Sequence, residues 1–110
     1  MSRDVRLYLE DIQLSCQKII RYTAGMSFDT FLKDDRTYDA VIRNLEIIGE
    51  AARNVTAEFQ ADHPAVAWRK TIALRNIIAH EYFGVKDEII WDIIQKEIPE
   101  LGERIQSILG

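Results

Sequence analysis

The chain has 110 residues, enough for one hydrophobic core, and a net charge of -4. Its 47% hydrophobic and 29% charged residues are typical of a folded domain and argue against disorder. No apolar run approaches the roughly 20 residues of a membrane-spanning helix, and residues 1–4 lack the features of a signal peptide. We therefore expect a single domain over residues 1–110 that stays in the cytoplasm. The acidic charge disfavours a general polyanion-binding surface, so any RNA chemistry must depend on a local site.

Helical periodicity predicts the first elements of the chain. Only two prolines and five glycines interrupt the sequence, and no alternation typical of paired strands is present, so the predicted class is all-α. Apolar residues three and four apart predict a first helix over about residues 4–23. Ser27 is a suitable N-cap for a short helical turn over residues 28–33. Cys16 falls within the apolar stripe of the first helix, where we expect a core residue and not a reactive thiol.

The most regular pattern in the chain predicts a third helix of some five turns. Its core positions recur at helical spacing: Val41, Leu45, Ile48, Ala52, Val55 and Phe59. Its opposite face carries four charged residues of alternating sign, which we interpret as a solvated surface with pairs along the helix: Arg43, Glu46, Glu50 and Arg53.

Turn-forming residues divide the second half of the chain into two further helices. Pro64 suits the first position of a helix that would run to about Tyr82. Gly84 is placed to end that helix, Asp87 to cap the next one, and Pro99 to kink or restart it. Four longer helices with short links predict an up-and-down four-helix bundle with one short extra turn.

The predicted helix that begins at Pro64 is apolar on nearly every side. An outer helix of so small a bundle needs only one buried stripe, so we expect a second copy of the chain to cover it, as a twofold dimer with this helix at the seam. Arg75 lies in the middle of one apolar side, where an unpaired guanidinium would cost several kcal/mol. It therefore needs an anionic ligand, an open cleft, or an acidic partner such as Glu46 or Glu50.

A second polar pair on the same helix, Asn76 and His80, lies on a different face, about 140° from Arg75 if the helix is ideal. Arg75 and His80 can reach one phosphate in two ways. Either the helix end unwinds near His80, or two protomers contribute one residue each across the seam.

The string Arg75-x-x-x-x-His80-x-Tyr82 resembles the RNA-cleavage motif of the HEPN superfamily, in the form with a tyrosine found in its HepT toxin branch. Segments 43–52 and 91–99 also resemble that branch in order and spacing, and the likeness covers nearly the whole chain. The resemblance implies a helical bundle whose dimer brings two motifs to a shared cleft. It also implies RNA cleavage without a metal ion, with the ribose 2′-hydroxyl as the nucleophile.

The same resemblance implies a role for each polar residue of the motif. His80 would be the general acid or base, Arg75 would orient the phosphate, and Asn76 would support either of them. An imidazole with a pKa near 6.5 can accept the hydroxyl proton at neutral pH. One motif histidine per chain leaves the leaving group without an acid, and we expect the second protomer to supply it.

The resemblance also implies a regulatory partner. In the HepT branch a minimal nucleotidyltransferase antitoxin attaches AMP to the tyrosine that matches Tyr82. An anionic adenylate beside Arg75 and His80 would compete with the RNA phosphate. No cofactor is expected: the chain has no ligand pair typical of zinc, and we interpret its other histidine, His63, as a loop residue before the next helix.

The same residues allow two other interpretations. A non-catalytic HEPN-like module would bind a nucleotide or assist a nucleotidyltransferase, with Arg75 holding a phosphate that is not cleaved. A purely structural dimerisation bundle would pair Arg75 with a carboxylate and leave His80 without a chemical role. Tyr82 would in that case only pack with Phe83 at the end of a helix.

Overall fold

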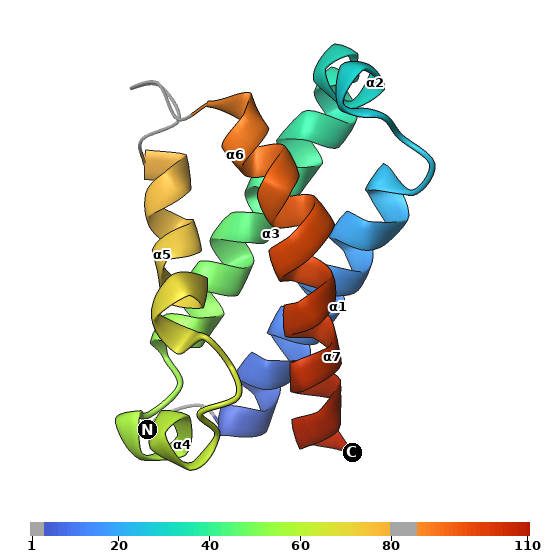
Figure 1. Cartoon of the computed structure of the whole chain (residues 1–110). Coiled ribbons are helices and arrows are strands. Elements are labelled where there is room, and N and C mark those ends of the chain that lie inside the picture. Colours follow the sequence, from blue (N-terminus) through green and yellow to red (C-terminus); the bar gives the residue numbers. More distant parts are fainter. Residues whose placement is uncertain (1–3, 80–85) are drawn as a thin grey trace.

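The computed structural model describes residues 4–79 and 86–110, and Figure 1 shows long helices that run alternately up and down. Along the chain, the helices of the first half are α1 (Val5–Thr23), α2 (Phe28–Lys33), α3 (Asp35–Arg53) and α4 (Ala57–Asp62). They are followed by α5 (Trp68–Ala79) and by a continuous rod of α6 (Asp87–Asp92), the π-helical turn η2 (Ile93–Glu97) and α7 (Ile98–Leu109). The described part of the chain contains no strand, and the predicted all-α up-and-down bundle is confirmed. No helix within it is both long and apolar enough to cross a membrane.

Side-chain caps explain where the first two helices begin. The carboxylate of Asp4 accepts a hydrogen bond from the backbone N–H of Arg6, so α1 starts at Val5. At the start of α2, the side chains of Ser27 and Thr30 each accept a hydrogen bond from the other's backbone N–H. The predicted limits of both helices are confirmed.

The predicted extent of the third helix is wrong. The apolar spacing continues to Phe59, but α3 ends at Arg53. The hydroxyl of Thr56 accepts a hydrogen bond from the backbone N–H of Phe59 at 3.2 Å, and this cap starts the separate helix α4. Within residues 4–79, the bundle therefore has two short connecting helices, α2 and α4, where one was predicted.

The predicted start of the next helix at Pro64 is also wrong. Pro64 lies in the turn that follows α4, and α5 begins at Trp68. The indole Nε1 of Trp68 donates a hydrogen bond to the carbonyl of His63 at 2.9 Å, which ties the turn to the first residue of α5. Backbone bonds within the turn, not a proline at the first helical position, set the start of this helix.

For the rod, two features were predicted, an N-cap at Asp87 and a kink or restart at Pro99, and the first prediction is wrong. Lys86 and not Asp87 is the N-cap of α6, and no side chain caps it. Asp87 instead accepts a hydrogen bond from the hydroxyl of Tyr38 at 2.7 Å. The restart at Pro99 is confirmed, because Pro99 lies in the first turn of α7 directly after the wider π-helical turn.

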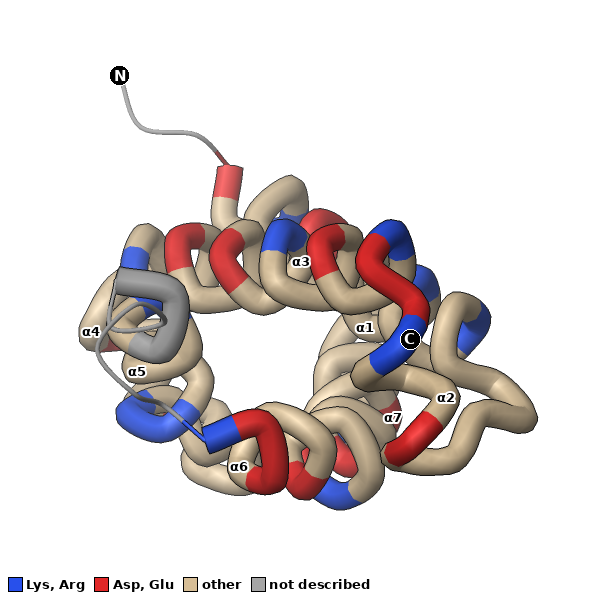
Figure 2. Tube along the Cα trace, turned by 90° about the horizontal axis from the view of Figure 1, so that it is seen from above, with Lys and Arg blue, Asp and Glu red and all other residues tan. Residues whose placement is uncertain are grey.

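The long helices surround one core, with α3 between α1 and α5, and α7 against α1 (Figure 2). The largest fully buried side chains line its interior: Phe31, Ile12, Ile19, Leu45, Ile48, Ile90, Ile98, Ile105, Val41 and Cys16. Of the helices that the structure describes, α5 packs closely only on α3. In the described residues, α5 thus makes closer backbone contact with α3 than with the rod.

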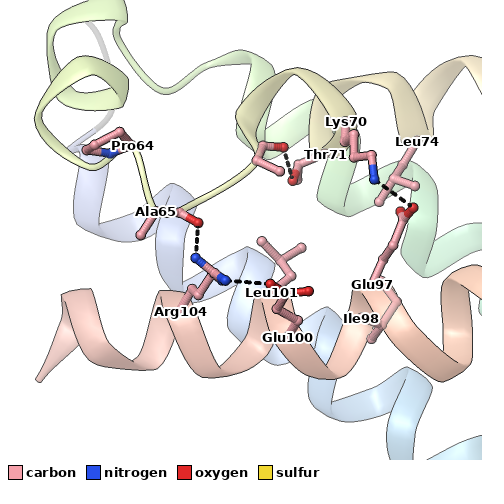
Figure 3. A pocket seen from close by; sticks show the side chains of 11 residues that line it. Pro64, Ala65, Lys70, Thr71, Leu74, Glu97, Ile98, Glu100, Leu101 and Arg104 are labelled. Atoms are coloured by element: carbon pink, nitrogen blue, oxygen red, sulfur yellow. Dashed lines mark hydrogen bonds and ion pairs between the residues drawn. The ribbon is translucent and has the colours of Figure 1, made fainter.

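Side chains bridge the seam between α5 and α7 around a cavity of about 280 Å³ (Figure 3). Arg104 on α7 donates to the carbonyl of Ala65 and pairs with Glu100. Lys70 on α5 pairs with Glu97 on the rod, with Nζ 3.7 Å from Oε1. The pair between Lys70 and Glu97 therefore links α5 to the rod, whereas Arg104 pairs within α7 and links that helix to the turn before α5.

The thiol of Cys16 belongs to the core, as predicted. Its side chain is 1% exposed, and burial raises its pKa from 9.0 to about 12. The thiolate is the reactive form of cysteine, so this side chain is inert at neutral pH.

We therefore expect Cys16 to resist alkylation and disulfide exchange in the folded protein. At pH 8, Ellman's reagent should label it only after denaturant is added. Because the pKa of the thiol is higher in the folded state, its contribution to the free energy of unfolding is complete below about pH 9. Between pH 9 and 12 the free energy of unfolding should fall by at most ~1.4 kcal/mol per pH unit as that contribution is lost. The Cys16→Ala variant should not show this fall. Rapid labelling of the native protein would contradict the buried position.

Candidate active site

Helices α3 and α5 meet at backbone contact where Gly49 faces Arg75. A Cβ atom at Gly49 would lie 2.6 Å from the backbone nitrogen of Arg75 and 2.8 Å from its Cβ. Both distances are shorter than van der Waals contact, so any side chain at position 49 would push α5 away from α3. Glycine inside a helix costs roughly 1 kcal/mol relative to alanine, and the close approach is the gain that offsets this cost.

The crossing places the guanidinium of Arg75 beside the outer face of α3. Its Nε lies 3.0 Å from Oε2 of Glu50, the residue that follows Gly49, and the two side chains are 48% and 49% exposed. Nη1 of Arg53, one turn further along α3, lies 3.7 Å from the same Oε2 atom. Two guanidinium groups, those of Arg75 and Arg53, therefore share one carboxylate at the surface.

The pair between Arg75 and Glu50 orients the guanidinium more than it stabilises the fold. A pair that is half exposed contributes about 0–1 kcal/mol, because water screens the charges and two side chains lose freedom. A carboxylate on the Nε edge of a guanidinium leaves the edge formed by its Nη groups for a second, bidentate contact. An anion such as a phosphate fits that remaining edge.

The acidic partner of Arg75 is Glu50 and not Glu46. Oε2 of Glu46 lies 3.8 Å from Nη1 of Arg43 on its own helix. The predicted pairing along the outer face of α3 is thus confirmed. Of the surroundings that the sequence allowed for Arg75, the structure shows an acidic partner, Glu50, and a side chain that is half exposed.

Two of the motif residues lie within the described structure and two do not. Arg75 and Asn76 are consecutive on α5, and Asn76 is exposed. His80 and Tyr82 lie outside the described residues, as does Gly84, the predicted end of the helix. The convergence of Arg75 and His80 therefore stays a prediction.

The helices on both sides of residues 80–85 are held in place. Before this segment, α5 rests on Gly49 of α3. After it, Asp87 at the start of α6 accepts the hydrogen bond from Tyr38 on α3. The ring of Trp91 on α6 lies 5.1 Å from that of Phe31 on α2, between centroids. Contacts to α2 and α3 thus determine where the chain leaves α5 and where α6 begins.

Metal-ligating side chains do not gather in the described residues: no three of His, Cys, Asp or Glu there are placed to hold an ion. His63 is the C-cap residue of α4, and its ring stacks at 4.3 Å, between centroids, on Phe59. This position agrees with the prediction of a loop residue.

Gly49 is the site residue that sequence reasoning missed. The pattern around it is strongly helical, and a glycine inside such a pattern is a signal of close backbone approach. The sequence carried that signal, but the helix that makes the approach is visible only in the structure.

Comparison with known proteins gives one family and several relatives. The family model described as "Ribonuclease HepT-like" matches residues 12–108. "Putative RNase MJ0127" of Methanocaldococcus jannaschii is 44% identical over 107 residues, covering 97% of this chain and 88% of the relative. "Putative RNase TTE0752" of Caldanaerobacter subterraneus subsp. tengcongensis is 45% identical over 104 residues, covering 94% and 93%. "Probable ribonuclease HepT" of Thermococcus cleftensis is 38% identical over 108 residues, covering 98% of each chain. No solved structure matches the chain.

Gly49→Ala should destabilise the fold even though alanine is the better helix former. The added Cβ would meet backbone atoms, and overpacking of this kind costs about 1–3 kcal/mol. Gly102→Ala is a matched control, because Gly102 is also buried in a helix but its Cβ would lie 3.6 Å from Cβ of Cys16, an ordinary contact. Urea denaturation should show a loss for the first variant and no comparable loss for the second. Equal free energies of unfolding would contradict the backbone contact.

Proposed function

Because the chain belongs to the ribonuclease HepT-like family, we propose that it is a metal-independent endoribonuclease that cleaves RNA by attack of the ribose 2′-hydroxyl. The observation that carries this proposal is the arrangement of Arg75. Its guanidinium is half exposed and is held at Nε by Glu50, the same carboxylate that Arg53 contacts. The names of the relatives support RNA as the substrate.

In the proposed reaction, His80 takes the proton of the 2′-hydroxyl. The 2′-oxygen then attacks phosphorus, the bond to the 5′-oxygen breaks, and the products are a 2′,3′-cyclic phosphate and a 5′-hydroxyl. Arg75 stabilises the charge that develops on the nonbridging oxygens, and its fork of donors suits this task better than a lysine. Asn76, the next residue on α5, supports either of these groups.

The leaving 5′-oxygen needs a proton, and each chain has only one motif histidine. We propose that a twofold dimer supplies the second His80 across a cleft lined by both copies. The open side of α5 supports this arrangement, because Ala73 is exposed there and Ile89 on the neighbouring α6 is 50% exposed. A second copy would remove this apolar surface from water.

We further propose that Tyr82 is the acceptor of AMP from a cognate minimal nucleotidyltransferase, so that the pair forms a toxin and antitoxin in the cytoplasm. In this proposal the adenylate brings a negative charge and a bulky base beside Arg75 and His80, where it competes with an RNA phosphate.

The wild-type protein should cleave RNA in the presence of EDTA and leave 2′,3′-cyclic phosphate ends. His80→Ala should lower the rate about 10²–10⁴-fold, as expected for loss of a general acid or base. His63→Ala is the control: this ring stacks on Phe59, and the variant should keep the wild-type rate. Cleavage of a labelled RNA gives the rates, and sedimentation gives the oligomeric state.

Several outcomes of that assay would reject the proposal. An undiminished rate in His80→Ala would reject the site, and a rate abolished by EDTA would reject the metal-independent mechanism. A wild-type protein that binds nucleotide or RNA without cleaving it would favour the non-catalytic binding module.

Adenylylation of Tyr82 is tested with a minimal nucleotidyltransferase encoded beside this chain. With ATP and Mg²⁺ it should add at least one adenylate to each protomer, measured by mass spectrometry, and RNA cleavage should stop. Tyr82→Phe keeps the ring but lacks the acceptor oxygen, so this variant should remain active and unmodified. Equal modification of Tyr82→Phe would place the acceptor at another residue.

A further inference from the structure

We propose that Gly49 and Glu50 are positioning residues of the site, which together fix the guanidinium of Arg75 before a phosphate arrives. The inference rests on the proposed ribonuclease function and deepens it. Neither residue has to touch RNA, because both act through Arg75. Gly49 determines where the arginine side chain starts, and Glu50 determines where it points.

Gly49 sets the distance between α5 and α3 at the level of Arg75. The position of a Cβ on Gly49 lies 3.0 Å from Cα, 2.8 Å from Cβ and 2.6 Å from the backbone nitrogen of Arg75. The arginine side chain therefore starts directly against the surface of α3. Even the smallest side chain at position 49 would move this starting point outward.

Glu50 sets the direction of the side chain. It follows Gly49 in the sequence, and its Oε2 contacts Nε of Arg75 at 3.0 Å. An exposed arginine otherwise occupies many rotamers, and a phosphate that binds it must order it. A carboxylate on the Nε edge does this ordering in advance and leaves the Nη edge for the phosphate.

Glu50 faces two guanidinium groups and not one. Nη1 of Arg53 lies 3.7 Å from the same oxygen, so two cations face one carboxylate. Glu46 makes a different contact: it pairs along α3 with Arg43. Of these two carboxylates, only Glu50 is in place to orient Arg75 from the neighbouring helix.

The test compares rates of RNA cleavage by the full chain. Glu50→Gln keeps the size of the side chain and removes its charge, and it should lower kcat roughly 10- to 100-fold, as a small misplacement of a reacting group does. Glu50→Asp keeps the carboxylate and should recover part of the rate. Gly49→Ala should lower kcat to a similar extent.

Two matched control variants distinguish a loss of Arg75 positioning from a general disruption of the fold. Glu10→Gln breaks an exposed pair on α1 in which Nε of Arg6 lies 3.2 Å from Oε1 of Glu10, and its rate should equal that of the wild type. Gly102→Ala adds a Cβ where there is room and should also keep the rate.

The decisive measurement is a double-mutant comparison in the Arg75→Ala background. If Gly49 and Glu50 act through Arg75, then Gly49→Ala and Glu50→Gln should lower the rate no further once Arg75 is absent. Additive losses, or wild-type rates in both single variants, would overturn the inference. If Gly49→Ala does not fold, the test uses Glu50→Gln alone. That variant should fold, because the pair it removes is exposed and contributes little to stability.

A spectroscopic readout keeps this inference separate from the proposed function. The Nε–H resonance of Arg75, assigned by its loss in Arg75→Ala, should shift in Glu50→Gln and stay unchanged in Glu10→Gln. If the wild type cleaves no RNA, the ribonuclease proposal fails, and with it the assignment of these residues to a reaction. A resonance that stays unchanged in Glu50→Gln would overturn the positioning role even in an active enzyme.

Discussion

The backbone contact between α3 and α5 at Gly49 is the constraint on which the candidate site depends. Within the part of the chain that the structure describes, α5 packs closely on no helix but α3. Side chains span the seam to the rod, as Lys70 does in pairing with Glu97. The position of α5 is therefore determined from α3, and the position of Arg75 is determined with it. In a bundle of this size, one residue without a side chain thus determines how closely Arg75 approaches α3.

Most of the fold follows from local signals in the sequence, and the wrongly predicted helix limits have a common cause. The caps at Asp4 and Ser27 act within a few residues of the chain, so they could be predicted. The break before Phe59 could not be predicted from spacing, because its side chain still packs against the core although a cap at Thr56 starts a new helix. Apolar periodicity reports which residues face the core and not where the backbone turns.

The site was harder to predict than the fold because it depends on a pair of helices. Arg75 can be recognised in the sequence because it is a charged residue among apolar ones. The sequence does not decide whether its acidic partner is Glu46 or Glu50. That choice depends on the register in which α5 crosses α3, and in the structure Arg75 lies against Gly49, next to Glu50. Sequence reasoning thus reached the correct set of charged residues. The structure was needed to say which carboxylate meets the guanidinium.

An oriented arginine also explains how an acidic protein can handle an anionic substrate. Basic and acidic positions are interspersed along the helices (Figure 2), and the net charge of -4 gives no long-range attraction for RNA. Binding must then come from short contacts to groups that are already in place. A guanidinium has two edges for bidentate contacts, so Arg75 can keep Glu50 on one edge while a phosphate binds the other. A lysine is a single point charge, and its carboxylate partner and a phosphate would compete for it. The pair between Arg75 and Glu50 is therefore compatible with the proposed binding of a phosphate at the other edge of the guanidinium.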